Sequence, residues 1–431
     1  MKRLISSLAA GLLAAALPLP GQDTGEPGAA DGRMISLDEA IQFTLSNNLA
    51  YRIASLDPQI AREAIVREEA VFDSELFATG RVSQSEQSTT FSQTTGTSSD
   101  TRTWNAGVRR QLAYGTTLTA ETSLDRRSSN AGVNTSNLSQ SADLALSLRQ
   151  PLLRGFGRAV NTAGLESARA GFAASLGSFR DQVWRILTEA EAAYWTVARW
   201  QEQLELAESR LEVAETLLQE ARERERVGLA TKIEVLQAEA SRAEFLEDII
   251  ETNRILEDAY DQLLTYMGVL LSPEMGDPAE AFRVARLPGQ AEQEMEFETV
   301  WRQALSVDPQ LAQQEATMAQ RRWDQVAARN ALKPNLDLVL SGAYTGLDDK
   351  EAETAYESAF DRDGHFWAVG FEFSMPWGRR GEKAALTISE NRLQQATLRY
   401  DELKQSLYRE VRAAWRNLRS INQSLEAARL T

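Results

Sequence analysis

The sequence predicts a mostly α protein with a β portion, in which long antiparallel coiled-coil helices are combined with amphipathic strands. Three observations carry this prediction. A seven-residue repeat of apolar or small residues runs through about 161–267, period-two alternation precedes it, and both patterns return later in the chain. Only 7% of the 431 residues are aromatic, which suits long helices better than a thick globular core.

Composition argues against several kinds of partner and site. The formal net charge is −16, and binding a nucleic acid normally requires a basic face, so we expect no nucleic-acid partner. The chain contains no cysteine, which rules out a disulfide framework and a thiolate metal site.

The N-terminus indicates secretion. Lys2 and Arg3 precede an apolar run from Leu4 to Leu17, and a stretch rich in proline and glycine follows. This order is typical of a signal peptide, and the run is shorter than the about 20 residues of a membrane-spanning helix. We expect a signal peptide over 1–21 and a linker over 22–33.

The first helix is expected over 37–72. Ser36 and Glu39 have the spacing of a capping box, in which both side chains satisfy free amides at a helix start. Pro58 is expected to kink this helix, because a proline inside a helix removes a backbone donor.

Strands are expected within 76–150, where the apolar period changes to two. Leu144, Leu146 and Leu148 alternate with more polar residues, as on a strand with one apolar face. The strand-like segments Trp104–Leu112 and Thr116–Leu124 either enlarge the sheet or form an external hairpin. The sequence leaves both alternatives open.

A long helix over 160–227 and a return helix over 231–268 are expected to pack along one seam. At the standard rise, the outgoing helix is about 100 Å long. The glycine between the helices allows the reversal of the chain. The seam residues expected in the return helix are Ile233, Leu236, Ala240, Ala243, Ile250, Leu256, Tyr260, Leu263 and Met267.

The pattern recurs in the second half of the chain. A constant offset places Phe297 on Leu37, Leu305 on Leu45 and Leu336 on Leu76. Each half has the order short helix, strands, proline and long helix, so we expect an internal duplication. The first repeat spans 34–270, a connecting segment spans 271–292, and the second repeat spans 293–431. The second repeat is expected to be truncated in its long helix.

Several short motifs resemble those of a known family. They are Ser36-Leu37-Asp38-Glu39-Ala40-Ile41, Gln150-Pro151-Leu152-Leu153 followed by Gly155-Phe156-Gly157, and Val227-Gly228-Leu229 followed by Ile233-Glu234-Val235-Leu236. Together with the duplication, they resemble the TolC-like outer membrane efflux proteins. The resemblance implies a duplicated TolC-like protomer in a homotrimer. Its strands join one barrel in the outer membrane, and its helices form a tunnel through the periplasm.

The resemblance also implies a function. The chain is expected to be the outer membrane channel of a tripartite efflux or type I secretion system. Such a channel is a passive conduit for small molecules or polypeptides. Its expected partners are a periplasmic adaptor (membrane fusion) protein, an inner-membrane pump of the RND or ABC type, and outer membrane lipid.

Physical constraints on membrane proteins support a barrel. In hydrocarbon every backbone amide must be paired, so strands can span a membrane only when the sheet closes on itself. Few strands are available in this sequence, and three copies could enclose a passage where one copy could not. The residues expected to face lipid are Leu144, Leu146, Leu148, Trp367, Val369, Phe371 and Phe373. A soluble sheet with one buried face is the alternative reading of the same alternation.

Two further kinds of site are expected. Pro151 and Pro376 stand where strand becomes helix, and proline at such a boundary redirects the chain. By resemblance, Val227, Gly228 and Leu229 form the periplasmic tip that faces the adaptor, and Glu234 matches an acidic position that helps to hold the tunnel shut. A plain helical hairpin turn is the alternative reading of the tip.

Catalytic chemistry is not indicated. His365 is the single histidine, and no zinc spacing, phosphate-binding glycine loop or serine elbow occurs. We therefore expect no enzyme activity, no cofactor and no metal site. Two other functions stay open, namely a periplasmic coiled-coil adaptor or scaffold and, with less support, an envelope hydrolase.

Overall fold

The computed structural model describes residues 33–86, 98–129, 138–269, 282–285, 296–349, 351–362 and 364–430. The expected signal peptide and the linker up to residue 32 lie outside these residues. The chain divides into two compact units. The hairpin unit comprises Met1–Gln42 and Glu191–Leu287, and the sheet unit comprises Phe43–Ala190 and Pro288–Thr431. Helix α6 (Ala163–Arg226) starts in the sheet unit and ends in the hairpin unit.

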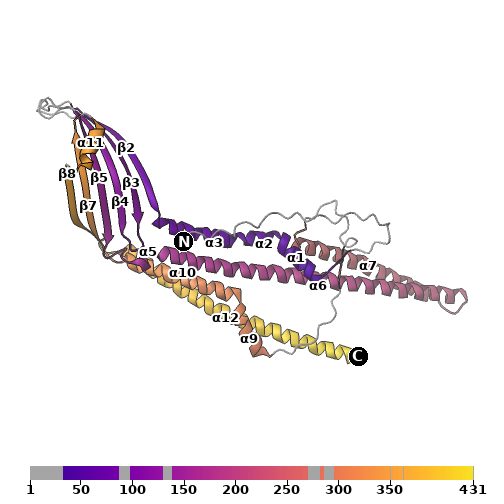
Figure 1. Cartoon of the computed structure of the whole chain (residues 1–431). Coiled ribbons are helices and arrows are strands. Elements are labelled where there is room, and N and C mark those ends of the chain that lie inside the picture. Colours follow the sequence, from indigo (N-terminus) through magenta and orange to yellow (C-terminus); the bar gives the residue numbers. More distant parts are fainter. Residues whose placement is uncertain are drawn as a thin grey trace, which may run out of the picture. The chain divides into compact units, whose positions relative to one another are not determined.

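The sheet unit is built on one six-stranded sheet with the order β2-β3-β4-β5-β7-β8. Every neighbouring pair is antiparallel, and the strands lie side by side in Figure 1. The strands are β2 (Ser74–Glu86), β3 (Ser98–Gln111), β4 (Thr117–Ser129), β5 (Leu138–Pro151), β7 (Asn335–Asp348) and β8 (Gly364–Ser374).

The first helical segment of the chain is broken twice. It consists of α1 (Leu37–Asn47), α2 (Leu49–Ala54), α3 (Leu56–Glu69) and the short 3-10 helix η1 (Ala70–Phe72). Asn48 caps α2, with its side-chain oxygen accepting the Tyr51 N–H at 2.9 Å. The helix breaks at Ser55, within one turn before Pro58, which agrees with the expected kink because a proline lacks the donor that would bond to the preceding turn. The break places Pro58 in the first turn of α3, where no intrahelical donor is needed.

In the sheet unit, helices α3, α6, α10 (Pro309–Ala331) and α12 (Arg380–Leu430) lie beside one another in this order. Arg169 of α6 contacts Glu69 of α3 at 3.2 Å, and Ser167 of α6 donates to Asp324 of α10 at 3.0 Å. Tyr400 of α12 donates to Glu315 of α10 at 3.0 Å. The short helices α5 (Arg158–Asn161) and α9 (Phe297–Val307) belong to the same unit.

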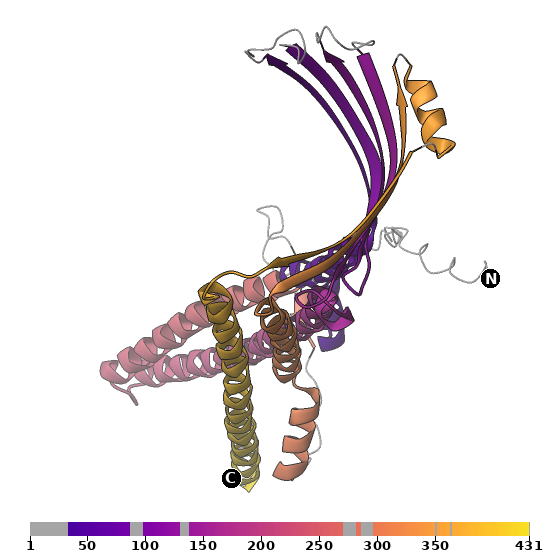
Figure 2. The ribbon, with the colours of Figure 1, turned by 90° about the vertical axis from the view of Figure 1, so that its left-hand side faces the viewer.

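Helix α11 (Ala352–Phe360), which the sequence analysis does not predict, packs on the sheet. Ala355 and Ala359 are fully buried against β5 and β7, where Ala142 is also fully buried. The sheet is curved, and α11 lies on its convex side (Figure 2).

The hairpin unit consists of the second part of α6, helix α7 (Lys232–Tyr266) and a small sheet. Strand β1 (Arg33–Ile35) pairs in parallel with β6 (Phe282–Val284). The core of this unit centres on Tyr194, whose side chain is fully buried. Its hydroxyl lies 2.9 Å from the Ala285 carbonyl oxygen and 3.1 Å from that of Ile35. The other core residues are Ile35, Ala40, Ala193, Val197, Leu256, Ala259, Tyr260, Leu263, Met267 and Val284.

The predicted seam of the return helix is correct at one end and wrong at the other. Leu256, Tyr260 and Leu263 are buried, as expected. Ile233, Leu236 and Ile250 are exposed in this chain. The seven-residue repeat identifies apolar positions, but α6 covers only one side of α7, so these three residues lie outside the intramolecular seam.

The two halves of the chain show the same order of elements. In the first half, α1–α3 precede β2 and β5, and a long helix follows. In the second half, α9 and α10 precede β7 and β8, and a long helix follows. Strands β3 and β4 stand between β2 and β5, whereas α11 stands between β7 and β8. The duplication itself stays a prediction. None of the described helices combines the length and the apolarity that crossing a membrane requires.

Candidate functional site

The sheet has one apolar face and one polar face, because side chains alternate and directly paired residues share a face. All seven residues expected to face lipid lie on the same face, which we call the apolar face. Across the six strands its residues include Leu76, Ala78, Trp104, Ala106, Val108, Leu118, Ala120, Leu124, Leu144, Leu146, Leu148, Leu338, Leu340, Tyr344, Trp367, Val369, Phe371 and Phe373.

Large side chains of the apolar face are open to solvent in the single chain. The exposed fraction is 55% for Leu146, 74% for Trp367 and 68% for Phe371. Exposed apolar patches of this extent mark surfaces that contact lipid or another protein. The apolar face therefore needs an apolar partner, either lipid or protein, to shield it from water.

The polar face carries a group of charges that joins three strands. Arg149 of β5 donates to Asp337 of β7 through Nη2 at 2.6 Å and through Nε at 2.9 Å. The same Nη2 lies 2.8 Å from Glu372 of β8. Farther along this face, Ser123 of β4 donates to Asp143 of β5 at 2.9 Å. Polar side chains thus bond to one another across the strands on this face.

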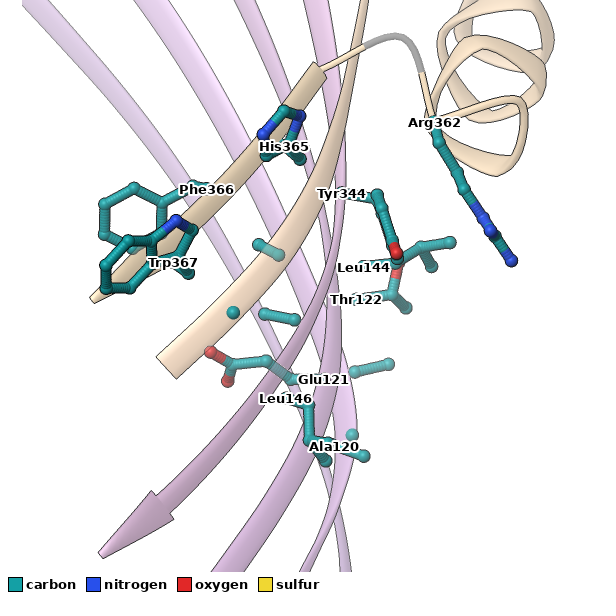
Figure 3. A pocket seen from close by; sticks show the side chains of 15 residues that line it. Ala120, Glu121, Thr122, Leu144, Leu146, Tyr344, Arg362, His365, Phe366 and Trp367 are labelled. Atoms are coloured by element: carbon teal, nitrogen blue, oxygen red, sulfur yellow. The ribbon is translucent and has the colours of Figure 1, made fainter. Parts of the chain in front are cut away.

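A hollow of about 990 Å³ lies along the sheet beside α11. Figure 3 shows Thr122, Leu144 and Tyr344 pointing toward the side on which Arg362 lies. The Arg362 guanidinium stands 5.4 Å from the centre of the Tyr344 ring. Sequence reasoning missed this feature, because α11 and the small residues beneath it carry no strong periodic signal.

The strands pass into helices at a junction held by side-chain amides. The Asn330 side-chain oxygen accepts the Gly155 N–H at 2.7 Å. The Asn161 amide donates to the carbonyl oxygens of Gly155 and Gly157 at 2.7 and 2.8 Å. The Gly157 N–H donates to the Tyr114 carbonyl at 3.3 Å, which ties the turn between β3 and β4 to the same junction. These residues fix the direction in which the chain leaves the sheet.

The two prolines expected at strand-to-helix turns lie close to this junction. Pro151 is the last residue of β5 and pairs with Asp337 of β7. Pro376 lies two residues after the end of β8, and Arg379 beyond it donates to the Leu332 carbonyl at 2.6 Å. Their proposed role in redirecting the chain stays a prediction. Asn161 and Asn330 were missed, since an isolated asparagine near a glycine is a weak sequence signal.

The turn between α6 and α7 is a compact, exposed helical tip. The Gly228 N–H donates to the backbone carbonyl of Glu225 at 2.9 Å, and the Leu229 N–H donates to that of Arg224 at 2.8 Å. This pair of bonds is a Schellman motif, and Gly228 takes the positive φ of 75° that it requires. Val227 and Leu229 are 60% and 79% exposed.

The predicted tip residue Glu234 has a local structural partner. Its carboxylate accepts the Thr231 N–H at 3.2 Å and the Thr231 hydroxyl at 2.9 Å, which forms a capping box at the start of α7. The exposed apolar turn is therefore flanked by the Schellman bonds on one side and by the capping box on the other. Farther along the helical hairpin, a groove of about 380 Å³ is lined by Val213, Ala214, Leu217, Ala238 and Phe245, among others.

Comparison with known proteins shows what the chain is similar to. The model of the outer membrane efflux protein family matches residues 116–269. The outer membrane efflux protein BepC of Brucella suis is 26% identical over 293 residues. That match covers 66% of this chain and 58% of BepC, so it spans less than two thirds of the relative's length.

Solved structures show the same fold. The CmeC outer membrane channel of Campylobacter jejuni superimposes with a TM-score of 0.63 at 14% identity, covering 91% of this chain and 73% of that channel. The open MtrE outer membrane channel of Neisseria gonorrhoeae has a TM-score of 0.54 at 19% identity, covering 91% and 75%.

These comparisons confirm the predicted fold, a helical part combined with the sheet of an outer membrane channel. Within the described ranges, no group of three or more metal-binding side chains is gathered. In fold, the chain is similar to solved outer membrane channels, and residues 116–269 match the outer membrane efflux protein family.

Proposed function

We propose that the chain is one protomer of a homotrimeric channel through which a tripartite efflux or type I secretion system exports its cargo. The channel is a passive conduit that works with a periplasmic adaptor and an inner-membrane pump. One observation carries this proposal: the six-stranded sheet combines an apolar face with two edges that have no strand partner among the described residues.

The apolar face meets the requirements of contact with lipid. In an outer membrane barrel, apolar side chains point outward and polar side chains line the interior. The apolar face carries Trp367, Val369, Phe371 and Phe373 of β8, while the polar face carries Arg149 and its acidic partners. Since α11 packs on the convex side of the sheet, the apolar face is the convex one (Figure 2). This is the direction that a lipid-facing surface must have.

The two sheet edges support assembly with further copies. A six-stranded sheet is too narrow to enclose a channel, and in a membrane its edges cannot stay unpaired. Strand β2 at one edge is antiparallel to β8 at the other edge, because five antiparallel steps separate them. The β8 edge of one copy can therefore pair with the β2 edge of the next in the same antiparallel manner throughout.

The helices of the sheet unit have matching open edges. On α2 and α3, Leu49, Ile53, Leu56 and Ile60 form an exposed stripe with the spacing of a coiled-coil seam. On α12, Ile388 and Leu398 are also exposed. Helix α3 leads into β2, and β8 leads into α12. Sheet and helices would thus associate with a neighbouring copy along the same two sides.

The exposed tip supports contact with an adaptor. Val227 and Leu229 project from a turn whose backbone bonds are satisfied within the turn. Exposed apolar residues on a rigid turn give a partner a surface that costs little entropy to bind. Glu234 caps α7 and supports this turn, in addition to the closing role that the resemblance implies.

Oligomeric state and conductance in one preparation test this proposal. We expect the purified protein to require detergent, to migrate as a heat-sensitive trimer and to produce ion-conducting steps in a planar lipid bilayer. A monomer that dissolves in plain buffer without affinity for lipid vesicles would contradict the proposal. That outcome would favour the periplasmic adaptor or scaffold instead.

A further inference from the structure

The hairpin formed by β3 and β4 has no equivalent between β7 and β8, where α11 stands in its place. We infer that this hairpin is part of the membrane wall, so that each copy contributes six strands and three copies close a barrel of eighteen strands. The number of copies rests on the proposed function. The place of the hairpin rests on its own contacts.

Backbone pairing places the hairpin inside the sheet. The register between β2 and β3 runs without interruption from Ser74↔Arg110 to Glu86↔Ser98. The register between β4 and β5 runs likewise from Thr117↔Arg149 to Ser128↔Leu138. Strands β2 and β5 are therefore separated by two complete strands. An external flap would leave β2 paired directly with β5.

Side chains continue both faces of the sheet across the hairpin. Trp104 and Val108 of β3 extend the apolar face, and Leu124 and Ala120 of β4 lie opposite them. On the polar face, Thr103 of β3 bonds to Asp125 of β4, and Ser123 of β4 bonds to Asp143 of β5. A hairpin outside the barrel would expose its apolar side chains to water, which is unfavourable. In the wall, the same row contacts lipid.

The turn of the hairpin is fastened to the junction below the sheet. Its residue Tyr114 accepts the Gly157 N–H, and Thr116 bonds to Gln150 of β5. Gly115 fits so closely that a Cβ atom there would lie 2.3 Å from the Gly155 carbonyl oxygen. The hairpin therefore spans the whole distance from this junction to the far end of the sheet, as a wall strand must.

An even number of strands keeps the closure antiparallel. Removing or adding one hairpin changes the strand number by two and leaves β2 antiparallel to β8. Barrel diameter grows roughly linearly with strand number, and barrels of about 16–18 strands leave an aqueous channel. The hairpin accordingly widens the barrel without changing how the copies meet.

Single cysteines in the otherwise cysteine-free chain test the wall assignment. Asn105→Cys lies on the polar face of β3, and its neighbour Ala106→Cys lies on the apolar face and serves as the matched control. In trimers reconstituted into lipid vesicles, a bulky water-soluble maleimide is expected to label only Asn105→Cys. Labelling of both positions, or of neither, would overturn the inference.

Excision of Ser98–Ser129 is the second test, because it removes β3 and β4 and leaves a connection between the adjacent ends of β2 and β5. Electron cryomicroscopy of the unmodified trimer is expected to show eighteen strands. The barrel of the excised variant should be narrower by about one third. A twelve-stranded barrel in the unmodified trimer would overturn this inference and leave the proposed function intact. A protein that forms no trimer would instead refute the proposed function.

Discussion

Tyr194 joins the small sheet of the hairpin unit to the long helix. Its phenol is fully buried, and its hydroxyl lies within hydrogen-bonding distance of two backbone carbonyls. Burial raises the pKa of the Tyr194 phenol. The neutral phenol is thus the form that the fold stabilises.

Replacing Tyr194 by phenylalanine tests this role. Tyr194→Phe should cost about 1 kcal/mol, because it removes a buried hydrogen bond and leaves the Ala285 carbonyl without this donor. The contribution of the phenol is fully present below its unfolded pKa of about 10 and is lost as pH rises through the higher folded pKa. Thermal unfolding followed between pH 8 and 11 should therefore show a smaller alkaline decline in the variant. An equal decline in both proteins would contradict this role.

The two faces of the sheet should differ in how well they tolerate a charged substitution. Phe371→Arg places a cation on the apolar face and should destabilise the membrane-inserted state by about 2–4 kcal/mol near the bilayer centre. Ser374→Arg, on the polar face of the same strand, should have little effect. The yield of trimer in outer membrane fractions measures both. Equal tolerance at the two positions would remove the lipid-facing assignment.

At the scale of elements, the turn between β3 and β4 depends on a glycine. Gly115 has a φ of 92°, and its backbone lies against the Gly155 carbonyl. A residue other than glycine destabilises the fold by about 1–2 kcal/mol when its backbone is left-handed. A Cβ atom at this position would also clash with its neighbours.

Gly115→Ala should therefore lower the yield of heat-sensitive trimer on gels. Gly157→Ala is the matched control, since Gly157 has a φ of 101° with no atom near its missing Cβ. The control carries the conformational cost without the clash, so it should reduce the yield less. Indistinguishable yields would show that the close approach at Gly115 is unimportant.

Elements with a strong period could be predicted from sequence, and elements defined by their partners could not. Leu144, Leu146 and Leu148 alternate clearly, and the structure places them on one face with Phe371. Ile233 and Ile250 have the same apolar character as buried seam residues, yet they are exposed. Periodicity shows on which face of its own helix or strand a side chain lies. It does not show which of these faces is covered by another element.

The same limit applies to the candidate site. The glycine in the tip and the prolines at the ends of the strands are local signals, so their positions were predictable. Asn330 and Gly155 are far apart in sequence, and only the folded chain brings them within 2.7 Å. Whether β3 and β4 joined the sheet depended likewise on pairing partners that no local pattern specifies.

At the scale of the whole molecule, the proposed function requires an adaptor that contacts the tip. Leu229→Asp changes an exposed side chain in a turn whose backbone bonds stay intact, so trimer levels should be unchanged. Loss of the apolar contact should abolish export in cells that also produce the adaptor and the pump. Glu225→Ala, at the same exposed turn, is the control and should export normally. Unimpaired export by Leu229→Asp would remove the tip assignment.

The open edges and the exposed apolar face of the sheet have a consequence for the way in which the protein is made. Before assembly, a single chain has β2 and β8 edges that are unpaired within the described sheet, and a broad apolar surface that is exposed to water. Such features are templates for aggregation. If the proposed function holds, a single chain should aggregate unless a chaperone covers these surfaces until the trimer and the bilayer cover them.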